Sequence, residues 1–299
     1  MELTVLGCGG FMPYPGQAVP AFLLRRQGTS YLLDAGEGTQ LRMVEAGLSR
    51  TALEAIFISH MHGDHTLGLP GVLIRRGQEG CEDPLHIVGP PQLENYVHSF
   101  QENSLFNLRY ELRFVPLRGA ELHTFSQVWV GTAQLEHRIE TFGFVLCARG
   151  RKRKFHPDKA RALGIPCGPL WGKLQKGQEI VLDDGRVVKP GEVSDPPPRG
   201  PKIVYITDTR PVFDYPKSFY EPDLLIHEAM FLEKHRHHAE KKYHATALEA
   251  ARVASHLKAG KLLLTHRSRR YNNPDLLRKE AAAEFSEVEL ARDGMQIEV

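Results

Sequence analysis

Three histidines and one aspartate fall within residues 60–65 of the stretch ISHMHGDH, directly after an apolar run. They are His60, His62, Asp64 and His65. Imidazole and carboxylate groups together suit Zn²⁺, which takes three or four protein ligands and keeps a position for water in a catalytic site. Gly63 permits a sharp turn, so these side chains are expected to converge on a small volume. Because one ion cannot use all of them, the pattern predicts two ions.

Other apolar runs also end in residues of the ligand type. They are His137 after TAQLE, Asp208 after VYIT, His227 and Glu228 after DLLI, and His266 after LLLT. Function collects at one end of the sheet in layered α/β folds, so this recurrence predicts one shared site. The predicted ligands form two sets and a bridge: His60, His62 and His137 for the first zinc ion, Asp64, His65 and His266 for the second, and Asp208 between them.

Elements that position these residues follow from the hydrophobic pattern. Short apolar runs bounded by turn residues predict strands at 3–7, 21–26, 30–36, 53–60, 84–90, 110–117, 128–137, 141–148, 202–209, 223–229 and 261–266. Helical spacing predicts helices at 38–47, 92–100, 245–260 and 273–285. In the third of these, Thr246 is the expected N-cap, with Glu249 three residues later. Helices recur between the strands, which predicts an α/β fold with helices covering packed sheets.

Composition narrows the class of protein. The 299 residues, 41% of them hydrophobic, suit one large domain or a domain carrying an insertion. Four cysteines without a C-x-x-C pair argue against a disulfide framework or a thiolate zinc site and fit a reducing cytoplasm. A signal peptide and an apolar run of about 20 residues are both missing, so a soluble, cytoplasmic protein without membrane contact is expected. The net charge of +2 is too small to indicate nucleic-acid binding by itself.

Residues 149–200 differ from the rest of the chain. They begin with the basic run RGRKRK, continue through GIPCGPLWGKLQKGQ, and end near DPPPRGP, with few apolar runs long enough for a core strand. This composition predicts an excursion from the domain and not a second domain.

The order of motifs resembles the ribonuclease Z family, in its short form, within the metallo-β-lactamase superfamily. The resemblance rests on LGCGG, LLDAGEGTQ, ISHMHGDHTLGLPG, LEHRIETFGF, GPLWGKL, VYITDTRP, LIHEAMF, YHATALEAA and LLTHRSRRY, and it covers nearly the whole length. It implies an αββα sandwich made of residues 1–148 and 201–299, with residues 149–200 as a protruding arm. All seven predicted ligands match family metal ligands.

The resemblance also implies an activity. Such an enzyme removes the 3′ trailer from precursor tRNA with two Zn²⁺ per subunit and leaves a 3′ hydroxyl on the tRNA. Asp64 is then the proton acceptor, His244 donates a proton to the leaving 3′ oxygen, and Glu228 orients His244. A homodimer is expected from the family.

The arm is expected to grip the tRNA. By resemblance its Gly-Pro motif is Gly168 and Pro169, and the best basic patch is Arg151, Lys152, Arg153 and Lys154. For Trp171, anchoring the arm is favoured over stacking on a base. The segment 234–242, KHRHHAEKK, is expected to be a charged surface loop.

One departure leaves alternatives open. The family pattern has an Arg-Asn pair after the first glycine-rich loop, but residues 11–20 contain neither Arg nor Asn. A phosphodiesterase of the same fold that acts on other RNA ends or small phosphodiesters therefore remains an alternative. Carbon-ester or thioester hydrolases would have no use for the basic arm. A non-catalytic RNA-binding protein is disfavoured because no ligand position is substituted.

Overall fold

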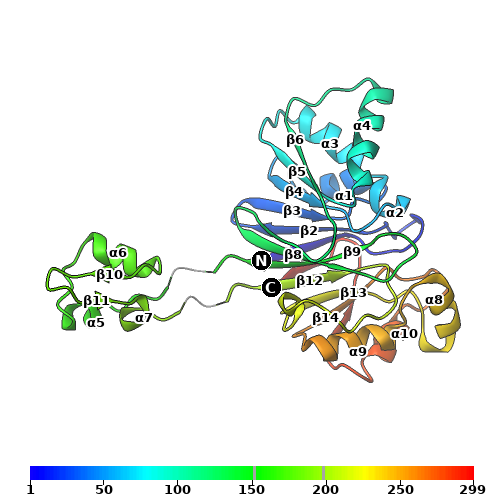
Figure 1. Ribbon diagram of the computed structural model, residues 1–299. Helices are drawn as coiled ribbons and strands as arrows, with labels where there is room; N and C mark the ends of the chain where they lie inside the picture. Colours follow the sequence, from blue (N-terminus) through cyan, green and yellow to red (C-terminus); the bar gives the residue numbers. More distant parts are fainter. Residues whose placement is uncertain (151–152, 197–198) are drawn as a thin grey trace. The chain divides into compact units, whose positions relative to one another are not determined.

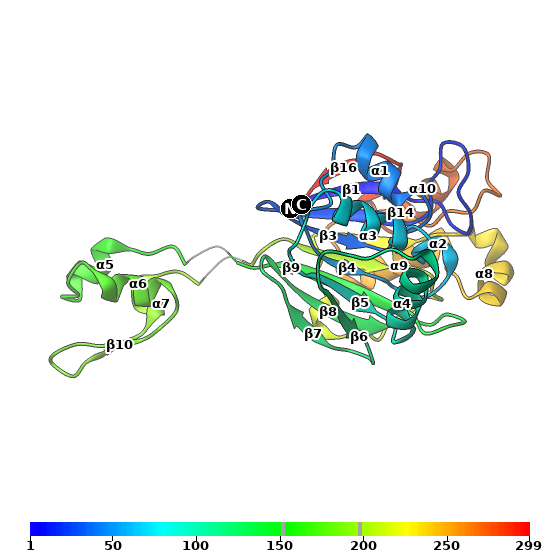
Figure 2. The same ribbon diagram turned by 90° about the horizontal axis from the view of Figure 1, so that it is seen from above.

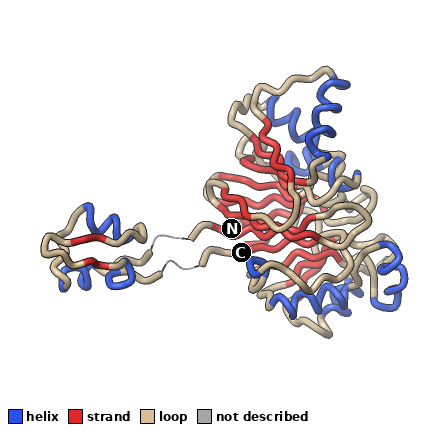
Figure 3. Tube along the Cα trace, in the orientation of Figure 1, coloured by secondary structure: helices blue, strands red, loops and turns tan. Residues whose placement is uncertain are grey.

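The computed structural model describes residues 1–150, 153–196 and 199–299. It divides into two compact units, of which the larger joins Met1–Cys147 to Pro201–Val299 and the smaller is Ala148–Gly200. In the described part of the chain, the larger unit contains two seven-stranded sheets (Figure 3).

The first sheet has the order β16-β1-β2-β3-β4-β5-β6. Its strands are β1 (Glu2–Gly7), β2 (Ala21–Arg26), β3 (Thr29–Leu33), β4 (Leu53–Phe57), β5 (Leu85–Gly89), β6 (Leu112–Pro116) and β16 (Gln296–Glu298). Strands β3 to β6 are parallel, so their carboxyl ends meet at the same edge.

The second sheet has the order β15-β14-β13-β12-β9-β8-β7. Its strands are β7 (Leu122–Thr124), β8 (Val128–Gln134), β9 (Phe142–Ala148), β12 (Lys202–Ile206), β13 (Leu224–Glu228), β14 (Leu262–Thr265) and β15 (Val288–Leu290). Here β12 to β15 are parallel and again place their carboxyl ends at one edge.

Helices cover the outer face of each sheet (Figure 1). On the first sheet these are α1 (Thr39–Glu45), α2 (Gly63–Thr66), α3 (Leu69–Gln78) and α4 (Gln92–Ser104). Near the second sheet lie α8 (Arg236–Lys242), α9 (Ala247–Leu257) and α10 (Asp275–Ala281). The short 3₁₀ turns η1 (Lys217–Phe219) and η2 (Glu233–His235) lie near them. One apolar cluster joins α1, α3 and α4 to the first sheet, and another joins α9 and α10 to the second. The inner faces meet through rings such as Phe57 and Phe144, whose centroids are 5.5 Å apart. The predicted αββα fold is therefore confirmed.

The two ends of the described chain lie side by side at the edge of the first sheet (Figure 2). The Met1 amine donates a hydrogen bond to the Val299 carbonyl at 2.7 Å, and β1 pairs with β16 in antiparallel register.

Sequence patterns located most of these elements and missed a few. Helix α3 was not expected, because Pro70 and Gly71 obscure its apolar spacing, and the three-residue strands β7, β15 and β16 are too short to show a period. The capping box of α9 is confirmed, since Thr246 and Glu249 exchange hydrogen bonds of 3.2 and 2.9 Å. This helix ends at Leu257, three residues before the expected stop.

The smaller unit has a core of its own. It contains α5 (Pro157–Ala162), α6 (Pro169–Gln175), α7 (Pro190–Val193) and the pair β10 (Ile180–Val181) and β11 (Val187–Val188). Its buried core includes Ile165, Leu174 and Val193. Trp171 anchors this unit as expected, because its indole N–H donates to the Ile165 carbonyl at 3.2 Å and its ring packs on Phe155.

None of the helices among the described residues combines the length and apolar character that crossing a membrane requires.

A buried carboxylate joins the two sheets. Asp34 follows β3, and its oxygens accept hydrogen bonds from the Ser59 amide at 2.7 Å and from the Tyr205 hydroxyl of β12 at 2.6 Å. Its Oδ2 also lies 2.7 Å from Nδ1 of His65. All four residues are buried. A buried carboxylate is tolerated only with such partners, so Asp34 ties both sheets to the metal-ligand stretch.

We predict that Asp34→Ala strongly destabilises the metal-free protein. The change leaves the buried polar groups of Ser59, His65 and Tyr205 without their acceptor, and breaking a buried pair in this way costs about 3–5 kcal/mol. Tyr205→Phe removes one donor to a charged acceptor and should cost about 1.5–3 kcal/mol. Urea unfolding of the wild-type protein and of both variants measures the loss of stability. If the variants unfold at the same midpoint as the wild-type protein, Asp34 does not hold the two sheets together.

Candidate metal centre and active site

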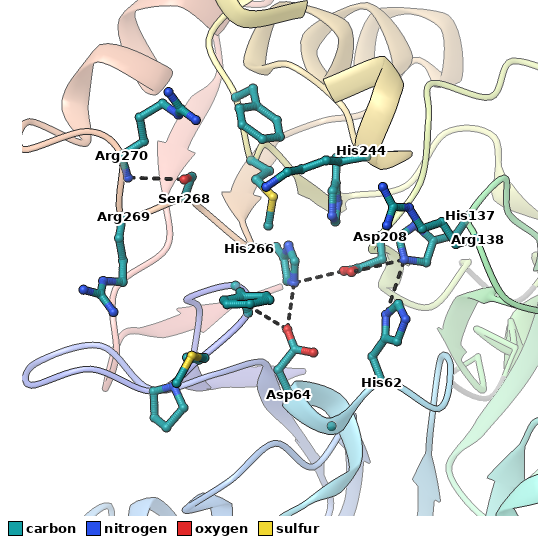
Figure 4. A pocket seen from close by; sticks show the side chains of 18 of the residues that line it. His62, Asp64, His137, Arg138, Asp208, His244, His266, Ser268, Arg269 and Arg270 are labelled. Carbon is teal, nitrogen blue, oxygen red and sulfur yellow. Dashed lines mark hydrogen bonds and ion pairs between the residues drawn. The ribbon is translucent and has the colours of Figure 1, made fainter. Parts of the chain in front are cut away.

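All seven predicted ligands meet in one place, six of them beyond the carboxyl ends of parallel strands and His137 beyond the antiparallel strand β8. His60 and His62 follow β4, Asp64 and His65 lie in α2, His137 follows β8, Asp208 follows β12, and His266 follows β14. Gly63 is the first residue of α2, so a short helix, and not an isolated glycine turn, directs Asp64 and His65 inward. Figure 4 shows Asp64, His266 and Asp208 pointing toward one another from different elements.

The first group consists of His60, His62, His137 and Asp208, whose candidate ligand atoms lie within 4.8 Å of one another. His60 Nε2 is 3.0 Å from His62 Nδ1, and His137 Nε2 is 3.4 Å from the same His62 atom. Asp208 Oδ2 lies 3.6 Å from His60 Nε2. Three imidazoles and one carboxylate whose ligand atoms lie this close together form a candidate site for a divalent cation.

The second group consists of Asp64, His65 and His266. His65 Nε2 and His266 Nε2 are 3.4 Å apart, and Asp64 Oδ2 lies 3.3 Å from His266 Nε2. The other oxygen of Asp208, Oδ1, is 3.1 Å from His266 Nε2 and 3.4 Å from His65 Nε2. Asp208 thus presents one oxygen to each group, which is the geometry of a bridging carboxylate.

The protonation states in the first group suit cation binding. Burial lowers the pKa of His60, His62 and His137, so their neutral forms, which bind metals, are favoured. Burial opposes ionisation of Asp208, but His266, His65 and His60 outweigh it and hold its pKa well below the usual range. Neutral imidazole nitrogens that face one another around a carboxylate fit a divalent cation between them.

In the second group, His65 favours its protonated, positively charged form. Burial disfavours the charged form of His65, but the carboxylates of Asp34, Asp208 and Asp64 outweigh it and raise its pKa well above the usual value. Burial likewise disfavours ionised Asp64, yet His65 and His266 hold its pKa below the usual range. A cation bound here would take the place of the His65 proton.

Partners behind the ligands fix their orientation. Nδ1 of His60 lies 2.9 Å from Ser59 Oγ, and Nδ1 of His137 lies 2.8 Å from the Tyr243 carbonyl, which leaves each Nε2 directed at the site. Gly10 packs directly on the His266 ring, because a Cβ there would lie 2.7 Å from Cε1 of that ring. A larger residue at Gly10 would displace His266.

His244 and Glu228 form a pair beside both groups. His244 Nδ1 lies 2.9 Å from Glu228 Oε1, which also accepts the Thr209 amide at 2.6 Å. Burial disfavours the charged form of His244, but Glu228, with Asp208 and Asp64 behind it, raises the pKa of His244 to about 9. A protonated imidazole is therefore held next to the candidate metal groups at neutral pH.

A cavity of about 750 Å³ opens in front of these residues. Its lining includes His62, Asp64, His244 and the basic residues Arg138, Lys242, Arg269 and Arg270. Figure 4 places Ser268, Arg269 and Arg270 on one side of His266 and Arg138 with His137 on the other. Cations on two sides suit a substrate with several phosphates.

Some expected residues lie elsewhere. His227 ends β13 beside Glu228 but points the other way, as alternate residues in a strand do, and its Nδ1 lies 2.7 Å from the Glu228 carbonyl. Residues 234–242 form η2 and α8 in place of a loop, and no candidate metal group among the described residues includes them. Asp34 was missed as a partner of His65, although it too ends an apolar run.

The arm residues belong to the smaller unit. Gly168 and Pro169 are exposed at the start of α6, where Gly168 has φ 152° and a Cβ would meet nothing within 4 Å. Lys154 is exposed and Arg153 half-buried. Arg151 and Lys152 lie outside the described residues.

Comparison with known proteins gives one partial match to a family model and full-length matches to curated relatives. A family model described as anti-Pycsar protein Apyc1 matches residues 1–148. Curated proteins named ribonuclease Z are similar over the full length: that of Treponema denticola is 36% identical and covers 100% of this chain and 98% of its own, and that of Shouchella clausii is 37% identical and covers 98% and 95%.

Solved structures agree with this placement. Human tRNase Z, short form, superposes with a TM-score of 0.71 at 27% identity, covering 100% of this chain and 99% of that one. The metallo-β-lactamase fold protein YhfI of Bacillus subtilis, at 22% identity and a TM-score of 0.68 over 99% and 98% of the two chains, shares the fold. With relatives this similar over almost their whole length, the chain belongs to the ribonuclease Z family.

Proposed function

We propose that this protein is a metal-dependent endoribonuclease that removes the 3′ trailer from precursor tRNA and leaves a 3′ hydroxyl on the tRNA. The observation that carries the proposal is the pair of His/Asp groups bridged by Asp208 and flanked by His244, in a chain similar to ribonuclease Z over its full length.

Two Zn²⁺ per chain are the proposed cofactors. His60, His62 and His137 would hold one ion, Asp64, His65 and His266 the other, and Asp208 both. Bound ions would lower the pKa of water toward neutrality and neutralise charge on the phosphate. Nitrogen-rich donor sets with carboxylates favour zinc over magnesium or calcium, which prefer all-oxygen ligands.

The chain's own residues supply the proton transfers. An attacking water oxygen forms a bond to phosphorus while the bond from phosphorus to the 3′ oxygen of the tRNA breaks. Asp64 is the proposed acceptor of the proton of the attacking water, because its carboxylate lines the cavity with Oδ2 3.3 Å from His266 Nε2. His244, charged below a pH of about 9, donates a proton to the 3′ oxygen, and Glu228 orients it.

The smaller unit is proposed to bind the tRNA body. Gly168 and Pro169 offer exposed backbone for close approach, and Arg151, Lys152, Arg153 and Lys154 offer charge to phosphates. A homodimer and a cytoplasmic location complete the proposal, on the strength of the family resemblance. The alternative substrate class, other RNA ends or small phosphodiesters, is favoured by the lack of Arg and Asn in residues 11–20.

We predict that His62→Ala lowers the metal content by about one ion per chain, because it removes a ligand from the first group only. His62 is half-buried, so the fold should tolerate the change. Elemental analysis of the purified protein measures the content. His237→Ala, outside both groups, is the control. Equal metal content in the two variants would contradict the assignment.

The pH profile tests the His244–Glu228 pair. A raised pKa means that the proton on His244 is present below a pH of about 9 and lost above it, so kcat/KM should decline on the alkaline side. Glu228→Gln removes the carboxylate and should move this decline to lower pH by about 1–3 units. Glu136→Gln, an exposed carboxylate paired with Arg210, is the control. If the alkaline decline of kcat/KM stays at the same pH in Glu228→Gln, His244 is not the acid that protonates the 3′ oxygen.

If the arm binds tRNA, loss of its basic residues should weaken the processing of precursor tRNA and leave the hydrolysis of a small phosphodiester unchanged. Replacing Arg153 and Lys154 together by Ala should raise KM for precursor tRNA and reduce its salt dependence by about 0.7–0.9 per lost phosphate contact in the log–log slope. Hydrolysis of bis(p-nitrophenyl) phosphate should stay unchanged. Arg278→Ala with Lys279→Ala, a basic pair on α10, is the matched control. Equal losses on both substrates would show that the arm patch does not bind RNA.

A further inference from the structure

Phe11 lines the cavity with an exposed aromatic side chain and a strained backbone, and both features are energetically unfavourable. Its side chain is 77% exposed, and its backbone has φ 78°, in the left-handed region that favours glycine. An exposed ring loses the benefit of burial, and the backbone conformation carries strain. An exposed ring on a strained backbone is typical of a residue with a function. Phe11 lines the same cavity as His62, Asp64 and His244.

The backbone of Phe11 is coupled to the metal centre. Its N–H donates to Asp64 Oδ2 at 2.8 Å, and the preceding Gly10 packs on the His266 ring. The backbone from which the Phe11 ring projects is therefore positioned relative to Asp64 and His266.

A second ring and an arginine continue this surface. Tyr14 is 53% exposed, and the guanidinium carbon of Arg269 lies 3.9 Å from the centroid of its ring. Arg269 also lines the cavity, together with Met12 and Pro13. We call Phe11, Met12, Pro13, Tyr14 and Arg269 the aromatic rim.

Rings and guanidinium planes of this kind are the surfaces on which single-stranded nucleotides stack their bases. The rim combines them with a positive charge for a phosphate, and it borders the groups that would cleave a phosphodiester. A carbon-ester or metabolite substrate without bases would gain little from such a surface.

We propose that Phe11 stacks on the base of a nucleotide next to the scissile phosphate, while the Tyr14–Arg269 pair contacts the adjoining nucleotide or its phosphate. The proposal rests on the proposed ribonuclease activity and adds a substrate-positioning residue to it. Residues 11–20 contain no Arg or Asn, so this loop holds the RNA through ring faces.

The first experiment compares single variants on a precursor tRNA with a short trailer. Phe11→Ala should lower kcat/KM by about 5- to 150-fold, the range seen when a stacking ring is removed, and Phe11→Trp should restore most of it. Leu105→Ala is the matched control, since Leu105 is also exposed, at 92%, and has φ 53° at the end of α4. Metal content and urea midpoints of all variants exclude loss of fold.

The second experiment removes the base in place of the ring. Two precursor tRNAs carry an abasic nucleotide immediately 5′ or 3′ of the cut. On one of them the wild-type protein should slow to the level of Phe11→Ala, with no further loss in the variant. The same wild-type to variant ratio on both abasic RNAs and the intact RNA would overturn the stacking contact.

The outcomes separate this inference from the proposed function. If Phe11→Ala cuts precursor tRNA as fast as the wild-type protein does, the inference is overturned and the proposed function stands. A wild-type protein that hydrolyses an aryl phosphodiester but never cuts precursor tRNA would overturn both. If Phe11→Ala changes the oligomeric state by sedimentation and shows no dependence on the abasic position, the ring serves a protein contact and the inference is wrong.

Discussion

The buried carboxylate of Asp208 is the constraint on which the site depends. It lies between two sets of imidazoles, with one oxygen 3.1 Å from His266 and the other 3.6 Å from His60. His60 comes from the first sheet and His266 from the second. A charge so deeply buried is stable only with counter-charges or cations around it, so the two sheets must be held in one relative position for the site to exist. Asp34, bonded to both sheets, supplies much of that restraint.

The backbone around the site is strained where the strands end. Asp34, Asp208, Tyr243 and His266 all have positive φ, a conformation that L residues rarely adopt. Such residues persist where the surrounding structure overdetermines them, and they cluster at functional sites. Asp208 and His266 turn their side chains toward each other, and Asp34 and the Tyr243 carbonyl contact His65 and His137 from behind. Three of these residues follow strands and Tyr243 follows α8, so the strain accompanies the meeting of these element ends.

The candidate metal ligands and the residues proposed to bind tRNA are divided along the chain. Among the described residues, the candidate metal ligands all lie in the larger unit, and the smaller unit contributes an exposed helix start at Gly168 and basic residues around its own small core. Under the proposed function, a net charge of only +2 is compatible with a polyanionic substrate, because basic residues gather at the cavity and in the smaller unit and are balanced elsewhere.

The sequence by itself determined the ligand types and the layered fold, because strand runs ending in His or Asp and the H-x-H-x-D-H spacing are local patterns. It could not separate His266, a site residue, from His227, a core residue, since both follow similar apolar runs. Only the tertiary structure decided that: His227 lies within β13 and faces away from the site, whereas His266 lies just beyond β14 with its Nε2 3.1 Å from Asp208 Oδ1. It alone revealed Asp34 as the partner of His65, Tyr205 as its tie to the second sheet, and Phe11 beside Asp64, because these contacts join residues far apart in the chain. Local periodicity carries no information on which distant residues meet.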